Sequence, residues 1–307
     1  MKFTKTMVAV AIAGIAATPL VASADTTLAG AVQIQLNGTD GDGDAADPTI
    51  NADDVLFGIT SEHALNGGAT GYGSLRVDMN RLSNAGRQTV DPGTPGNDED
   101  DVEIASVGSA DSVYVGLKGG FGDFRFGEIP NAVEYGQVAN DIYDVSGEIN
   151  GGISYTGSFG PVGLGLNWSP ENNQDLLGVG VKFGIGGFSI GLGAEDRAEA
   201  QNAAVGVSFA FSGASVAAHF HTREQAAGDD LESFSVKLGY GVGAISGSLT
   251  FSTETKDDAD IDNQAIRLDA VYDLGGGFDV STRITSESGN VAADDLVSWR
   301  LKLSKGF

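Results

Sequence analysis

The feature that most constrains this chain is a two-residue alternation of apolar and polar side chains that resumes after short, glycine-rich interruptions. Val113, Val115 and Leu117 alternate with polar residues, and Phe124 and Phe126 continue the apolar face after the glycines at 119, 120 and 122. Period-2 alternation on both sides of a tight turn predicts a β-hairpin. Because the pattern recurs along the chain, the sequence predicts an all-β protein.

About sixteen segments of roughly ten residues carry this pattern, which is the length of a strand that crosses a membrane. Short turns such as Asn66–Gly68 and Gly275–Gly277 join them and make neighbouring strands antiparallel. These turns alternate with longer acidic connections. A soluble sandwich has no reason to collect its long connections at one end, whereas an outer-membrane barrel has short periplasmic turns and long extracellular loops. We therefore predict a transmembrane antiparallel β-barrel of about sixteen strands, ahead of a soluble β-domain.

The N-terminal residues precede this pattern and form a separate segment. Lys2 and Lys5 are basic, the stretch from Met7 to Ile15 is apolar, and small residues occupy positions 22–24. This order is typical of a secretory signal peptide. We expect residues 1–24 to be a signal peptide and residues 25–307 to form the barrel domain.

Composition excludes two further possibilities. The chain has no cysteine, 46 glycines and a net charge of −25. No disulfide framework can stabilise it, and glycines in strands thin the inner face and mark tight turns. Nucleic acid is excluded as a partner, because phosphate contacts need an excess of Lys and Arg.

The basic residues indicate which face of the sheet is wet. None lies at the centre of an apolar face, where a charge costs about 2–4 kcal/mol at mid-membrane. A barrel of about sixteen strands is too wide for side chains to fill and leaves an aqueous channel. We place five basic residues in long connections: Arg81, Arg87, Arg197, Arg223 and Lys256. We expect the polar, lumen-facing side of the strands to carry Arg76, Lys118, Arg125, Lys182, Lys237, Arg267, Arg283, Arg300 and Lys302.

A connection of about twenty residues follows the hairpin, from Glu128 to Glu148, and is longer than a compact domain needs. We expect it to fold into the barrel and narrow it, although its acids could instead merely solvate a surface loop. Opposed charges across a constriction orient dipolar solutes and filter ions. The predicted pore constriction comprises Arg76, Lys118, Arg125, Glu134, Asp141 and Asp144.

No pattern predicts a catalytic or metal site. The acidic run from Asp40 to Asp44 lacks the Gly and the Glu of a calcium loop. His219 and His221 lie two apart on one strand face, and we expect them to be solvated residues of the lumen. No serine spacing indicates a nucleophile–base pair. We therefore expect no enzymatic activity, no cofactor and no bound metal.

Four segments of the chain share a further likeness: residues 26–32, 57–68 and 153–160, and most strongly the stretch from Val115 to Gly122. They resemble strands and turns of the general porins of Gram-negative bacteria, in particular the neisserial and β-proteobacterial type. The terminal Phe307 resembles the family's assembly signal. The resemblance implies a homotrimer of barrels, each with its own pore and with the third loop folded inward.

This chain departs from the family at the eyelet. Four positions where the family often has basic residues are not basic here, namely Leu56, Thr60, Glu128 and Ser154. The anion preference typical of the family is therefore not expected.

Two functions stay open at this stage. The first is a water-filled channel for passive diffusion of small hydrophilic solutes and ions, weakly cation-selective. It would lie in the outer membrane of a Gram-negative bacterium, against lipid and lipopolysaccharide. The alternative is a plugged structural or adhesive barrel whose acidic surface loops form the binding surface.

Overall fold

The computed structural model describes residues 25–41, 46–78, 87–90, 102–105, 109–138, 142, 149–170, 175–197, 200–225, 230–256, 261–289 and 296–307. The predicted signal peptide, residues 1–24, lies outside these ranges. No helix in the described ranges is long and apolar enough to cross a membrane.

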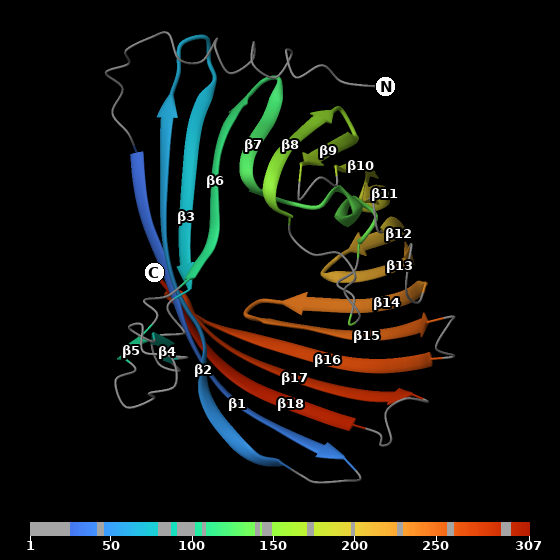
Figure 1. Ribbon diagram of the computed structural model, residues 1–307. Coiled ribbons are helices and arrows are strands. Elements are labelled where there is room, and N and C mark those ends of the chain that lie inside the picture. The colour runs from blue at the N-terminus through green and yellow to red at the C-terminus, as the bar shows by residue number, and fades with distance from the viewer. Residues whose placement is uncertain are drawn as a thin grey trace.

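Sixteen strands form one closed antiparallel barrel, in which each strand pairs with its neighbours in the chain and β1 pairs with β18 (Figure 1). This confirms the predicted fold class. The strands are β1 (Asp25–Gly41), β2 (Ala46–Ala64), β3 (Thr70–Asp78), β6 (Ser109–Gly119), β7 (Gly122–Ile129), β8 (Ile149–Phe159), β9 (Val162–Ser169), β10 (Leu176–Ile185), β11 (Phe188–Arg197), β12 (Ala200–Phe211), β13 (Ala214–Gln225), β14 (Leu231–Val242), β15 (Ile245–Lys256), β16 (Ile261–Gly275), β17 (Phe278–Gly289) and β18 (Leu296–Gly306).

Two short strands stand apart from the barrel. β4 (Arg87–Val90) and β5 (Val102–Ala105) pair only with each other, in the connection between β3 and β6. A short 3₁₀ helix, η2 (Ala132–Tyr135), lies in the connection between β7 and β8.

The two faces of the sheet differ as the alternation predicts. In β10, Leu177, Val179 and Val181 point outward and are 64%, 44% and 37% exposed, while Gly178 and Gly180 between them are buried. Large apolar side chains therefore cover the outside, where lipid can bury them, and the inner face is small or polar. Ile129, Ile149 and Leu176 form the one apolar cluster of buried residues in the described ranges.

The connections at one end of the barrel are tight. Residues 120–121, 160–161, 186–187, 212–213, 243–244 and 276–277 are two-residue turns, and both termini of the barrel lie at this end. We call it the turn end, and the opposite end the loop end. Gly276 and Gly277 have φ of 61° and 79°, a pair of positive values that suits the primed turns matching the twist of a hairpin.

Not every connection at the loop end is long. Residues 79–108 and 130–148 are long, but β11 and β12 are joined by residues 198–199 alone. The prediction that Arg197, Arg223 and Lys256 lie in long connections is wrong, since all three belong to strands. The strands extend beyond their apolar alternation because polar residues on the inner wall pair with each other, as Glu195 does with Arg197 and Asn202.

The last residue closes the barrel. Gly30 N donates to the Phe307 carbonyl at 2.9 Å, and Phe307 N donates to the Gly30 carbonyl at 3.0 Å. The Phe307 ring lies over Gly30, where a Cβ atom would also sit 2.9 Å from the Leu56 backbone oxygen. The sequence resemblance assigned Phe307 a role in assembly, and that role stays a prediction.

We predict that Gly30→Ala weakens the closure of the barrel, because its new methyl group meets backbone that cannot move away. Overpacking of this kind costs about 1–3 kcal/mol. The measurement is the folded fraction in detergent, read from the heat-dependent shift in gel mobility. Gly58→Ala is the matched control, since its Cβ would meet nothing closer than 3.6 Å. Equal folding of the two variants would contradict the prediction.

Candidate functional site

Residues 130–138, the first part of the connection between β7 and β8, enter the barrel, as predicted for the third loop. The helix η2, green in Figure 1, lies inside the ring of strands and contacts β9, β10, β11 and β12. Asn131 caps the helix, because its side-chain oxygen accepts a hydrogen bond from Val133 N at 3.0 Å. Asn131, Ala132 and Val133 are all buried against the wall.

Glycines on the inner wall let the loop lie directly on strand backbone. A Cβ atom on Gly193 would sit 2.5 Å from the Val133 carbonyl oxygen, and one on Gly165 would sit 2.5 Å from the Tyr135 ring. A Cβ atom at each of three further inner-wall glycines would also overlap the loop. We call these residues the glycine bed: Gly165, Gly180, Gly191, Gly193 and Gly206.

The side chain of Tyr135 fixes the end of η2. Its hydroxyl donates a long hydrogen bond of 3.4 Å to the Leu164 carbonyl. Partial burial raises the pKa of this phenol, so the hydroxyl keeps the proton that it donates. The loop therefore makes both backbone and side-chain contacts with the wall.

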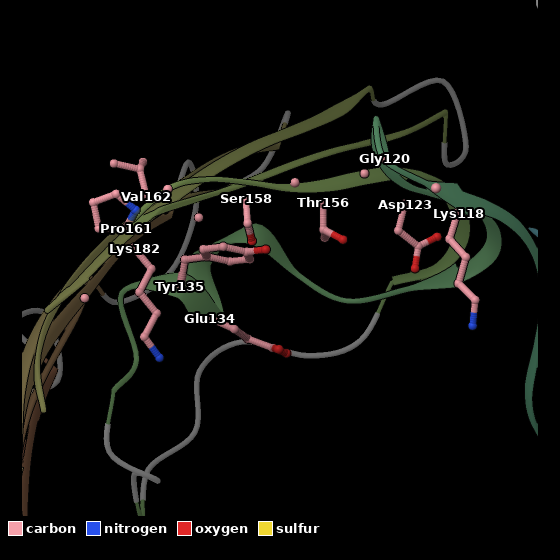
Figure 2. Close-up of a pocket in the computed structure, with 16 residues that line it drawn as sticks. Lys118, Gly120, Asp123, Glu134, Tyr135, Thr156, Ser158, Pro161, Val162 and Lys182 are labelled. Carbon is pink, nitrogen blue, oxygen red and sulfur yellow. The ribbon is translucent and has the colours of Figure 1, made fainter. Parts of the chain in front are cut away.

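A cavity of about 880 Å³ lies between η2 and the turn-end half of the wall. Lys118, Asp123, Glu134 and Lys182 line it together with glycines and small polar residues. Figure 2 shows these four charged side chains on one side of the sheet, with Glu134 on the loop between the wall residues. The loop thus brings a carboxylate into a space that the wall lines with both signs of charge.

The wall next to this cavity holds a network of charged and aromatic side chains. Lys118 Nζ pairs with Glu62 Oε1 at 2.6 Å, and both side chains are nearly half exposed, so the pair contributes little to stability. The Tyr72 hydroxyl donates to Asp123. The Arg125 guanidinium lies 4.1 Å from the centre of the Tyr114 ring, within the range of a cation–π contact.

A second group of charges lies on the inner face of β16, β17 and β18. Asp269 accepts from Arg283 Nε at 2.6 Å and lies 3.1 Å from Arg267 Nε. Arg300 is the direct cross-strand neighbour of Arg283, and Lys302 Nζ donates to Gln33 Oε1 at 2.7 Å. All of these residues except Arg267 line a separate cavity of about 440 Å³.

The structure brings together only part of the predicted constriction. Lys118 and Glu134 line one cavity, Arg125 lies beside it on Tyr114, and Arg76 is on the inward side of β3 opposite Ser112. Asp141 and Asp144 lie outside the described residues. The other predicted lumen cations sit on inward strand positions, with Lys182 in the first cavity and Lys237 beside Thr250.

One expectation about the lumen is wrong. His219 and His221 point inward, but they are 2% and 0% exposed rather than solvated. Gly136 packs on Ala204 and Val138 packs on Gly206, which are the cross-strand neighbours of the two histidines. The inserted loop therefore lies over this part of the wall and keeps water from it.

Sequence reasoning missed several residues of the site. Glu62 could have been found, because the tight turn after it fixes the register of β2 and β3 and places it opposite Tyr72. Asp123 could have been found in the same way from the turn at 120–121. Nothing in the sequence marked Tyr135 as an inner residue, since its place depends on where the loop lands.

Within the described residues there is no group of three or more His, Asp or Glu side chains that could hold a metal ion. In and beside the two cavities, Lys118 pairs with Glu62, Arg283 pairs with Asp269, and Arg125 lies on the Tyr114 ring.

Comparison with known proteins gives one family and one fold. The family model described as Gram-negative porin matches residues 9–290. No curated protein sequence matches the chain.

Solved structures share the barrel at low sequence identity. The trimer form of OmpT from Vibrio cholerae, folded in vitro, has a TM-score of 0.67 at 14% identity and covers 93% of this chain and 100% of that one. Outer-membrane expressed OmpT of Vibrio cholerae has a TM-score of 0.69 at 13% identity and covers 94% of this chain and 99% of that one. A triple mutant of Rhodopseudomonas blastica porin has a TM-score of 0.66 at 16% identity and covers 92% of this chain and 100% of that one. At such identities the likeness establishes the fold alone.

We predict that Gly193→Ala lowers the single-channel conductance, because its methyl group pushes the η2 backbone off the wall and into the lumen. Two Val133 backbone atoms, the carbonyl oxygen and Cα, would lie 2.5 and 2.6 Å from the new Cβ. Gly163→Ala is the matched control on the same inner wall, where the nearest atom is 3.7 Å away. Equal conductance of both variants in planar bilayers would show that the glycine bed does not position the loop.

Proposed function

Because the chain belongs to the family of Gram-negative porins and is an outer-membrane β-barrel, we propose that it forms a water-filled channel for passive diffusion of small hydrophilic solutes and ions. The observation that carries this proposal is the position of η2, which packs on one side of the wall and leaves a cavity of about 880 Å³ beside it. A plug would instead fill the lumen.

The mechanism that we propose is passive. The width left beside the inserted loop sets the size limit, and the charges on both sides of that space orient dipolar solutes. Glu134 on the loop and Lys118 on the wall are the described residues best placed for this role. Diffusion through an open pore needs no nucleophile and no metal, so we assign the protein no enzymatic activity.

We further propose that the channel is weakly selective for cations. The chain carries a net charge of −25, and its acidic residues are concentrated in the connections, several of which lie at the loop end. Acidic mouths raise the local concentration of cations. The basic residues on the inner wall oppose this effect, which is why the preference is weak.

The assembly that we propose is a homotrimer embedded in lipid and lipopolysaccharide. A trimer form has been solved for an outer membrane protein of Vibrio cholerae with a similar barrel. The exposed apolar residues of the outer wall would contact lipid or neighbouring barrels. We also propose that residues 1–24 act as a signal peptide and are removed before the barrel forms.

We expect the purified, unboiled protein to give stepwise conductance in a planar bilayer. Steps arriving in groups of three support the trimer. A reversal potential of the sign that favours cations, measured under a salt gradient, supports the selectivity. Folded protein without conductance would overturn the channel and favour a plugged barrel with a structural or adhesive role.

We predict that Glu134→Gln and Lys118→Gln shift the reversal potential in opposite directions. Loss of the Glu134 carboxylate lowers the preference for cations, and loss of the Lys118 ammonium raises it. A unit charge about 10 Å from the ion path in water contributes roughly 0.4 kcal/mol, with opposite sign for a cation and an anion, so the cation-to-anion permeability ratio changes by a factor of about four. Shifts of the same sign would contradict the placement of both residues beside the ion path.

A further inference from the structure

The inner face of β16, β17 and β18 carries a group of cations away from the loop. We call Arg267, Arg283, Arg300 and Lys302 the basic patch. All four have inward parity, because the residues between them, such as Ile284 and Leu301, are exposed on the outer face. The helix η2 packs on β9 to β12, so the patch belongs to a different part of the wall.

The register forces like charges together in this patch. Arg283 and Arg300 are direct cross-strand partners, and such pairs have Cβ atoms about 4.5–5.5 Å apart. Like charges in this position destabilise a sheet. Asp269 offsets part of the repulsion, but it is shared between Arg267 and Arg283. A fold that needed only a polar wall would place neutral residues here.

The patch faces a space that a small solute could enter. The cavity of about 440 Å³ lies within the size range of small-molecule sites. Four basic side chains line it, Arg283, Arg300, Lys302 and Lys305, against the two carboxylates Asp269 and Asp279. The cavity therefore has an excess of positive charge, although the chain as a whole is strongly acidic.

The donor groups fit one class of ligand. Guanidinium groups present parallel N–H donors that match the oxygens of phosphate, and such charge-assisted bonds are stronger than neutral ones. Arg283 is held by Asp269 and Lys302 by Gln33, so both side chains are positioned before a solute arrives. A halide ion is a single atom and cannot accept two parallel N–H bonds on separate oxygens, so the geometry favours oxyanions.

We propose that the basic patch is a binding site for multivalent oxyanions of the phosphate class, which retains them during passage through the lumen. This inference rests on the proposed function, because the solute must reach the wall through an open channel. It is compatible with weak cation selectivity. Acidic connections act on all ions at the mouth through the long-range field, whereas the patch acts at short range on ions that have several oxygens.

The test is the block of single-channel current by inorganic phosphate in a potassium chloride bath. We expect phosphate to reduce the current in a concentration-dependent way. Arg300→Gln should raise the half-blocking concentration about two- to fivefold, the range expected for one partly exposed charge. Lys237→Gln is the matched control, since it removes one inward cation of β14 outside the patch and should leave the block unchanged.

Each outcome supports or overturns the proposed phosphate site. An unblocked wild-type channel, or equal effects of Arg300→Gln and Lys237→Gln, would overturn phosphate binding at the basic patch. The proposed channel function would still stand. A second readout is the broadening of the phosphorus NMR line of phosphate by folded protein. Broadening that Arg300→Gln reduces and Lys237→Gln does not, in a barrel without conductance, would support the phosphate site and overturn the channel. Loss of both conductance and broadening would overturn both proposals.

Discussion

Closure of the sheet is the constraint on which the rest of this structure depends. Within lipid there is no water to satisfy an unpaired backbone group, and each one costs several kcal/mol. The chain meets this requirement by returning to its start, where β18 pairs with β1 and Phe307 exchanges two backbone hydrogen bonds with Gly30. Sixteen strands then enclose a lumen too wide for side chains to fill. The shape of the lumen then depends on which other part of the chain enters it.

What enters is the connection between β7 and β8, and its position depends on residues with no side chain. Gly191, Gly193 and Gly206 leave bare backbone on the inner wall, so the loop can lie on it at van der Waals distance. The contact buries Val133 as well as His219 and His221, and the described residues otherwise form one small buried apolar cluster, Ile129, Ile149 and Leu176. The narrowing of the channel is thus a packing feature of the wall and the loop together.

Charge is distributed on two length scales. The acidic connections act over distances comparable with the screening length, about 8–10 Å at physiological salt. On the inner wall, pairs such as Lys118 with Glu62 and Arg283 with Asp269 act at contact distance. The acidic connections slightly favour mobile ions of one sign of charge. The pairs on the inner wall favour ions of a particular shape at short range. The proposed selectivity and the proposed oxyanion site are therefore separate properties of one lumen.

The sequence by itself determined an antiparallel barrel of about sixteen strands and the face of nearly every strand residue, because side-chain direction alternates strictly along a strand. From that parity alone, the inward positions of Lys182, Arg283 and Lys302 could be predicted. It could not give the position of the loop on the inner wall, or the contact between Lys118 and Glu62, which lie on the two strands that flank β3 and are 56 residues apart. The Tyr135 ring, from the connection between β7 and β8, lies on Gly165 of β9. Only the tertiary structure decided these contacts and the burial of His219, since they depend on how parts of the chain that are distant in sequence pack together and leave no local periodicity.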